Sequence, residues 1–148
     1  MLTDWGLASL HHLFVFSLVG VIAAEWALVR PGLSGAGVAR LGKLDAAYGV
    51  LALLVIAAGV SRVIWGVRGW DYYAGNHSFW AKMASFAIVG ALSVPPSIRI
   101  GRWRKLQKTH LNFAPPEHEI ASMRRYLHAE ALFLALVPVF AAAMARGF

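Results

Sequence analysis

The chain has 148 residues, of which 59% are hydrophobic and 14% are charged, and its 14 Lys and Arg outnumber its 7 Asp and Glu to give a net charge of +7. This composition is typical of an integral membrane protein, and the length suits one domain of a few helices. The absence of Cys excludes disulfides, thiolate-held iron–sulfur clusters and covalent c-type haem attachment. Because the basic residues gather at the ends of apolar segments, they indicate membrane orientation and contact with anionic lipid rather than nucleic-acid binding.

Four apolar segments predict four transmembrane helices, at about residues 4–29, 44–65, 78–98 and 117–145. The first ends at the helix-breaking segment 30–32, and a Gly-rich loop follows it. Pro95 and Pro96 predict that the third helix kinks or ends near this pair. We therefore expect an all-α four-helix bundle that forms a single transmembrane domain over residues 1–148.

Basic residues are concentrated in the first and third loops of this predicted bundle. Only four lie near the opposite face: Arg62, Arg68, Lys82 and Arg146. The other ten are Arg30, Arg40, Lys43, Arg99, Arg102, Arg104, Lys105, Lys108, Arg124 and Arg125. The positive-inside rule then predicts that both loops are cytoplasmic and that both termini face outward. We expect an integral protein of a bacterial-type inner or plasma membrane, with the segment 99–108 as an anchor to anionic lipid.

The first apolar segment carries three ionisable side chains, His11, His12 and Glu25. His11, Leu18 and Glu25 lie seven residues apart, and because a helix drifts by only about 20° per heptad, they form one stripe. His12 points about 100° away from His11. Since ionisable groups in a membrane helix are almost always hidden against other helices, we expect this stripe to face the bundle.

Helix positions predict two polar clusters at different depths. The outer cluster, near the termini, comprises His11, His12, Arg62 and Lys82. The inner cluster, toward the cytoplasm, comprises Glu25, Asp45, Tyr48, His128 and Glu130. His128 and Glu130 are two residues apart and so cannot both line one cavity wall. Structural alternatives stay open: Lys82 and Arg62 can extend to the lipid headgroups, and Glu25 can pair with a basic residue of the first loop.

Two short segments carry a resemblance to known families: HHLFVFSLVG in the first helix and YYAGNHSFWAKMASF leading into the third. They are similar to small four-helix predicted membrane proteins of unknown function, and they resemble more distantly the HemJ-type protoporphyrinogen oxidases and the CopD-type copper-resistance domains. In the HemJ type, a helix-1 His and a Lys in a W-x-K segment are linked to b-type haem. The matching positions are His11, or its neighbour His12, and Lys82. The resemblance implies haem b with His11 and Lys82 as iron ligands.

These features lead to the hypothesis of a haem b-binding membrane redox protein, either a porphyrinogen oxidase or an electron carrier linked to quinone. Its catalytic residues are not assigned, Arg62 is a candidate partner for a haem propionate, and His12 is an alternate ligand or a proton carrier. One alternative is a small transport bundle that handles protons or cations through the inner cluster. Another is an accessory membrane subunit without a cofactor. Substrate, electron partner and oligomeric state, including a homo-oligomer, stay open.

Overall fold

The structure, a computed structural model, describes residues 2–110 and 112–147. Its helices are α1 (Leu2–Leu28), α2 (Gly35–Trp65), α3 (Gly69–Ala74), α4 (His77–Thr109) and α5 (Glu117–Ala145). No strand occurs within the described residues. The predicted all-α helical bundle is therefore confirmed.

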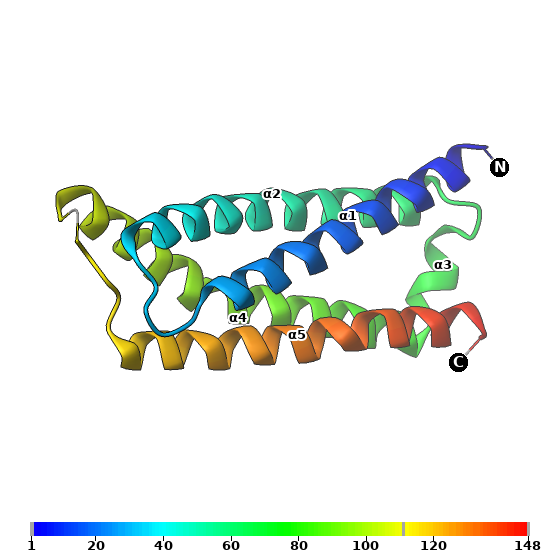
Figure 1. Ribbon diagram of the computed structural model, residues 1–148. Helices are drawn as coiled ribbons and strands as arrows, with labels where there is room; N and C mark the ends of the chain where they lie inside the picture. The colour runs from blue at the N-terminus through cyan, green and yellow to red at the C-terminus, as the bar shows by residue number, and fades with distance from the viewer. Residues whose placement is uncertain (1, 111, 148) are drawn as a thin grey trace.

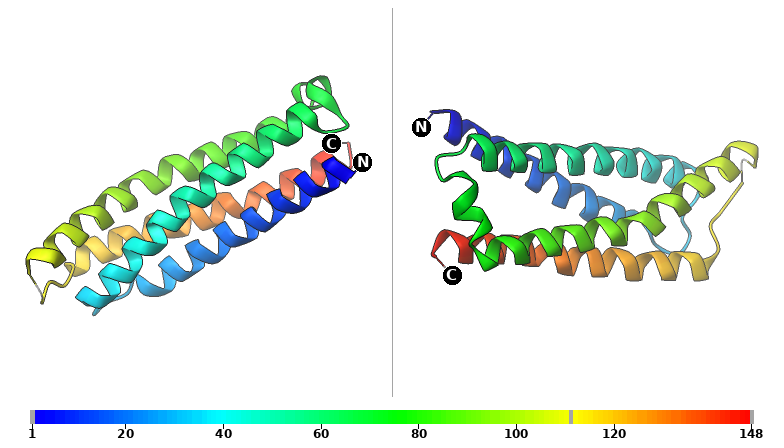
Figure 2. Two further views of the ribbon diagram at one scale, coloured as in Figure 1. Left: turned by 90° about the horizontal axis from the view of Figure 1, so that it is seen from above. Right: turned by 180° about the vertical axis from the view of Figure 1, so that it is seen from behind.

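The four long helices run side by side along one axis (Figure 1). α1 packs mainly against α2 and α4 mainly against α5, and the two pairs meet through α2 with α4 and α1 with α5. α1 begins and α5 ends at the same end of the bundle, where α3 connects α2 to α4 (Figures 1 and 2). The α1–α2 and α4–α5 connections lie at the opposite end, which we call the loop end.

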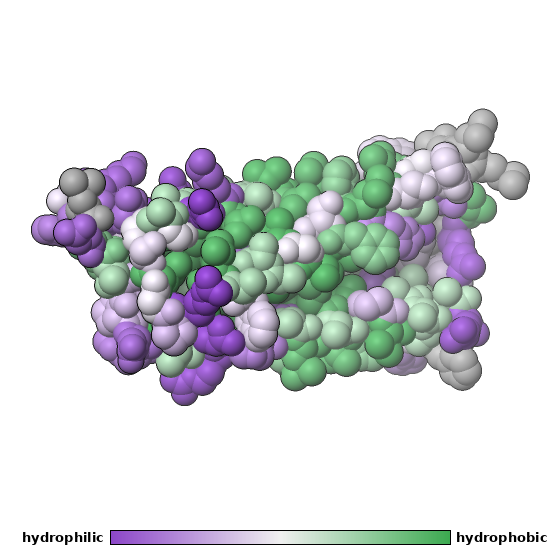
Figure 3. Space-filling view, in the orientation of Figure 1, coloured by the Kyte–Doolittle hydropathy of each residue, from purple (hydrophilic) through white to green (hydrophobic). Residues whose placement is uncertain are grey.

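The outside of the bundle is apolar over its middle part. Each of the four long helices is long and apolar enough to cross a membrane. Large apolar side chains on these helices are exposed, among them Leu13, Phe16, Leu53, Ile98 and Leu132. Figure 3 shows the apolar side chains as a broad band, with hydrophilic side chains gathered most densely toward the loop end. An apolar belt on helices that satisfy their own backbone is what a bilayer requires, so the chain is an integral membrane protein.

The interior contains two clusters of buried apolar side chains. The loop-end cluster comprises Val29, Leu33, Val38, Leu41, Ile100, Trp103, Ile120, Met123 and Leu127. The central cluster comprises Leu18, Ile22, Tyr48, Val55, Val89 and Leu134. Leu18 is buried and Glu25 is buried on the same face of α1, so the stripe predicted on the first helix does face the bundle.

α2 begins at Gly35, about nine residues before the predicted start near residue 44. The glycines of this segment indicated a loop, yet Val38 and Leu41 are fully buried in the loop-end cluster. At Gly42 a Cβ atom would lie 2.0 Å from Cδ of Arg104. Because Gly42 has no side chain, the Arg104 side chain of α4 can pack directly against the backbone of α2. Tertiary packing therefore outweighs the low helix propensity of glycine here.

α4 continues through Pro95 and Pro96 to Thr109, so the predicted end near residue 98 is wrong. The alternative expectation of a kink agrees with Figure 2, where the ribbon of α4 changes direction along its length. Proline removes backbone hydrogen bonds and bends a helix without having to end it when neighbouring contacts hold the following turns.

Those contacts converge on Glu119 in the first turns of α5. Trp103 donates from Nε1 to Glu119 Oε2 at 2.6 Å, and Arg99 donates to the Glu119 carbonyl oxygen at 3.1 Å. Arg102 forms an ion pair with the same carboxylate. The basic segment after the proline pair is thus a helix docked on α5, with its remaining charged side chains exposed.

Candidate cofactor cavity and buried carboxylate layer

A cavity of about 480 Å³ lies between the long helices toward the end where the chain begins and ends. Its volume falls in the range of small-molecule sites. The walls are mainly apolar and aromatic, and α3 contributes Tyr73 to them. Its ionisable side chains other than Tyr73 come one from each of α1, α2 and α4: His11, Arg62 and Lys82. We call this space the outer cavity.

His11 is held against α2 by close packing. A Cβ added at Gly59 would lie 3.5 Å from Cε1 of the imidazole, and the ring also interacts with the backbone of Val55. Its Nδ1 atom is buried and has no hydrogen-bond partner among the described residues. The His11 side chain also lines the outer cavity.

Arg62 and Lys82 add positive charge to the same space. Both interact electrostatically with His11. Arg62 Nε is buried and has no hydrogen-bond partner in the described part of the chain, and Lys82 Nζ lies 5.1 Å from the centroid of the Phe79 ring. None of the residues that line the cavity is Asp or Glu. In the described part of the chain, the one ion pair is that of Arg102 with Glu119, far along α4. The outer cavity therefore combines mainly apolar walls with positively charged side chains.

His12 is placed outside the cavity on an exposed face of α1. Its Nδ1 atom donates to the Ala8 carbonyl oxygen at 2.6 Å, and its ring meets that of His11 edge-on at 6.1 Å between centroids. The structure thus brings His11, Arg62 and Lys82 together and leaves His12 apart, as the 100° step between neighbouring helix positions dictates.

Deeper in the bundle, Glu25, Asp45 and Glu130 lie close enough for their charges to interact. We call these three side chains the carboxylate layer. Glu25 is 4% exposed and Glu130 is 1% exposed, and the Oε1 atom of each has no hydrogen-bond partner among the described residues. Asp45 accepts a hydrogen bond from the Ser97 hydroxyl at 2.5 Å, and Tyr48 lies beside the layer.

His128 lies outside the carboxylate layer, although we grouped it with the inner cluster. It is exposed on α5, and its Nε2 accepts a hydrogen bond from Trp26 Nε1 at 3.1 Å. The reason is the helix period, since a residue two positions from Glu130 points about 200° away from it. The guanidinium carbon of Arg124 lies 4.9 Å from the centroid of the Trp26 ring, and Arg124 donates a hydrogen bond to the Val29 carbonyl oxygen at 2.7 Å. Trp26, Arg124 and His128 therefore form a surface contact between α1 and α5. Neither Arg30 nor Arg40 forms an ion pair with Glu25.

Sequence reasoning missed the residues that complete these two sites. Ser93 and Ser97 lie four apart on α4, and this spacing was an available signal that one face of the helix is polar. Tyr73 carries no such signal, because its role comes from the packing of α3.

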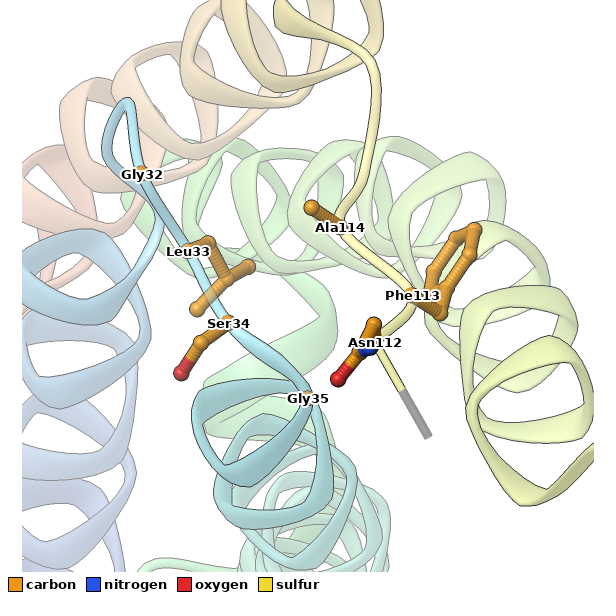
Figure 4. A pocket seen from close by; sticks show the side chains of 7 residues that line it. All are labelled: Gly32, Leu33, Ser34, Gly35, Asn112, Phe113 and Ala114. Carbon is orange, nitrogen blue, oxygen red and sulfur yellow. The ribbon is translucent and has the colours of Figure 1, made fainter. Parts of the chain in front are cut away.

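A second cavity, of about 290 Å³, lies at the loop end (Figure 4). It is lined by Gly32, Leu33, Ser34, Gly35, Asn112, Phe113 and Ala114. It has no ionisable side chain, and the described residues contain no group of three or more His, Cys, Asp or Glu arranged to hold a metal ion. The ionisable side chains of the outer cavity and the carboxylate layer therefore do not line this second cavity.

Comparisons with known proteins give a family without an assigned activity. No curated protein and no solved structure matches the chain. A family model described as "Predicted membrane protein (DUF2214)" matches residues 3–148, which is nearly the whole chain. The four long apolar helices agree with that description. The chain belongs to this family of predicted membrane proteins.

Proposed function

We propose that the outer cavity binds haem b and that the protein is a membrane redox protein. The observation that supports this is the meeting of His11, Arg62 and Lys82 in one mainly apolar cavity, whose described lining residues include no Asp or Glu. The imidazole of His11 and the guanidinium of Arg62 give the cavity polar side chains that suit an occupant with a polar group.

The side chains fit the three chemical parts of haem. The imidazole of His11 is a ligand for iron, and the apolar walls suit the macrocycle. The guanidinium of Arg62 suits a propionate, because charge-assisted hydrogen bonds to carboxylates are strong. In line with the resemblance of its W-x-K segment to the HemJ type, Lys82 would be the second iron ligand, and its amine would have to lose its proton to bind iron. When bound, haem supplies one-electron transfer, and the aromatic walls keep water from the site.

The proposed partners follow from where the cavity lies. It sits within the membrane-spanning helices, so a lipid-soluble reactant can reach it from the bilayer. We propose a membrane quinone as the electron acceptor and a porphyrinogen, or another reduced lipophilic substrate, as the electron donor. For each electron pair, the donor would lose two electrons and two protons, and the quinone would take up two electrons and two protons to become a quinol.

Absorption spectroscopy tests the proposal. Protein expressed with ample haem supply and purified in mild detergent is expected to show a Soret band that shifts on reduction. Gly59→Leu places a side chain against His11 and is expected to remove most of this band. Gly49→Leu is the matched control on α2, because a Cβ at Gly49 meets no atom within 4 Å, and it is expected to keep the band. A colourless wild-type protein would overturn the haem proposal.

We also propose that the loop end faces the cytoplasm and that both ends of the chain face outward. Ten of the 14 basic residues lie toward the loop end, and positive charge is retained on the cytoplasmic side. A reporter that is active only outside the cytoplasm should be active when fused to the C-terminus and silent when inserted at Ser34. The reverse pattern contradicts this orientation.

A further inference from the structure

The carboxylate layer lies between the two apolar clusters of the bundle interior. On α1, Glu25 follows Ile22 of the central cluster by three residues and precedes Val29 of the loop-end cluster by four. The other two acids are flanked in the same way, with Asp45 between Leu41 and Tyr48, and Glu130 between Leu127 and Leu134. Apolar packing therefore closes the layer both toward the loop end and toward the outer cavity.

No basic side chain of the described residues neutralises the layer. The groups that face it are Glu25 from α1, Asp45 and Tyr48 from α2, Ser93 and Ser97 from α4, and Glu130 from α5. Their interactions with one another are between acids, hydroxyls and a phenol. The basic residue nearest along α4, Arg99, is instead bonded to the Glu119 carbonyl oxygen.

Three ionised carboxylates cannot occupy a layer that lies between two apolar clusters and has no basic partner in the described part of the chain. Burying one unpaired charge away from water costs several kcal/mol, and a second like charge adds repulsion to that cost. A protonated carboxyl group, in contrast, gains an O–H donor, and a neighbouring carboxylate oxygen can accept from it. Hydrogen bonds of this kind would supply partners for the Oε1 atoms of Glu25 and Glu130, which have none among the described residues.

We propose that the carboxylate layer is a proton-binding site, in which Glu25 and Glu130 hold protons at neutral pH and hydrogen-bond within the layer. The ligand is the proton itself, held by hydrogen bonds between facing carboxyl groups. The site is separate from the outer cavity and does not depend on the occupant of that cavity. It gives the protein a buried proton store midway along the bundle.

Difference infrared spectroscopy tests this site directly. Wild-type protein at neutral pH is expected to show the C=O stretch of a protonated carboxylic acid, shifted when H2O is exchanged for D2O. Glu25→Gln and Glu130→Gln are each expected to remove part of this band. Glu117→Gln is the matched control, because Glu117 is an exposed acid in the first turn of α5, and it should leave the band unchanged.

Two outcomes overturn the proposal. One is a wild-type protein without a D2O-sensitive carboxylic band, and this measurement needs no variant to fold. The other is loss of the band when Na⁺, K⁺ or Ca²⁺ is added, which would make the layer a metal-cation site instead. His11→Ala should leave the band intact, so failure of the haem proposal and failure of this one give different results.

Discussion

Replacing His11 with Ala is expected to remove the haem Soret band almost completely, whereas His12→Ala is expected to leave it close to that of the wild type. The two residues are neighbours of the same type on one helix, so the pair controls for helix propensity and for expression. Of the two, only His11 lines the outer cavity, where its ring packs against Gly59 of α2. His12 is exposed and bonded within its own helix.

The measurement is the Soret absorbance per protein for purified variants prepared with the same haem supply. Lys82→Ala adds a second expectation: without the lysine amine as an iron ligand, haem would bind more weakly and its Soret band would shift. The opposite order, in which His12→Ala loses haem and His11→Ala keeps it, would place the cofactor outside the outer cavity. A Lys82→Ala spectrum identical to that of the wild type would remove Lys82 from the iron.

The membrane helices and the inward stripe could be predicted because both are local properties of the sequence. Hydropathy over about 20 residues defines a span, and the spacing of His11, Leu18 and Glu25 defines a face. The same period separates His128 from Glu130 and His11 from His12, and the structure places the members of each pair on different faces. The helical period alone therefore predicts, for most of these polar side chains, which of them can lie on the same face of a helix.

The helix ends could not be predicted, because they depend on contacts far apart in the sequence. α2 begins early because Val38 and Leu41 are buried against other helices. α4 passes its proline pair because Trp103 and its neighbours dock on Glu119, 16 residues beyond Trp103. Glycine and proline signal a break in the chain, but they do not reveal a partner that compensates for it.

The walls and the size of the outer cavity also could not be predicted from the sequence. Depth along the helices placed His11, Arg62 and Lys82 near one level, and all three line the outer cavity. The aromatic wall from α3 depends on a short helix that hydropathy does not indicate, and it is fixed in part by a hydrogen bond from Tyr72 to the Met144 carbonyl oxygen at 3.0 Å. The size of the space between helices follows from such contacts and not from composition.

Replacing Trp103 with Ala should destabilise the protein more than any other single truncation at the loop end. Trp103 is fully buried in the loop-end cluster, and truncating a buried Trp to Ala costs about 3–5 kcal/mol of the free energy of unfolding. The substitution also removes the indole donor to Glu119, one of the contacts that hold the second half of α4 on α5. The melting temperature in detergent, followed by circular dichroism, should fall markedly.

Two further variants separate packing from hydrogen bonding in this effect. Trp65→Ala removes an equally large side chain that is 67% exposed, so its free energy of unfolding should change by no more than about 0.5 kcal/mol. Trp103→Phe keeps most of the ring but loses the N–H donor, and a hydrogen bond to a charged group is worth about 1.5–3 kcal/mol, so it should fall between the other two. A Trp103→Ala variant as stable as Trp65→Ala would mean that α4 beyond its proline pair does not dock on α5.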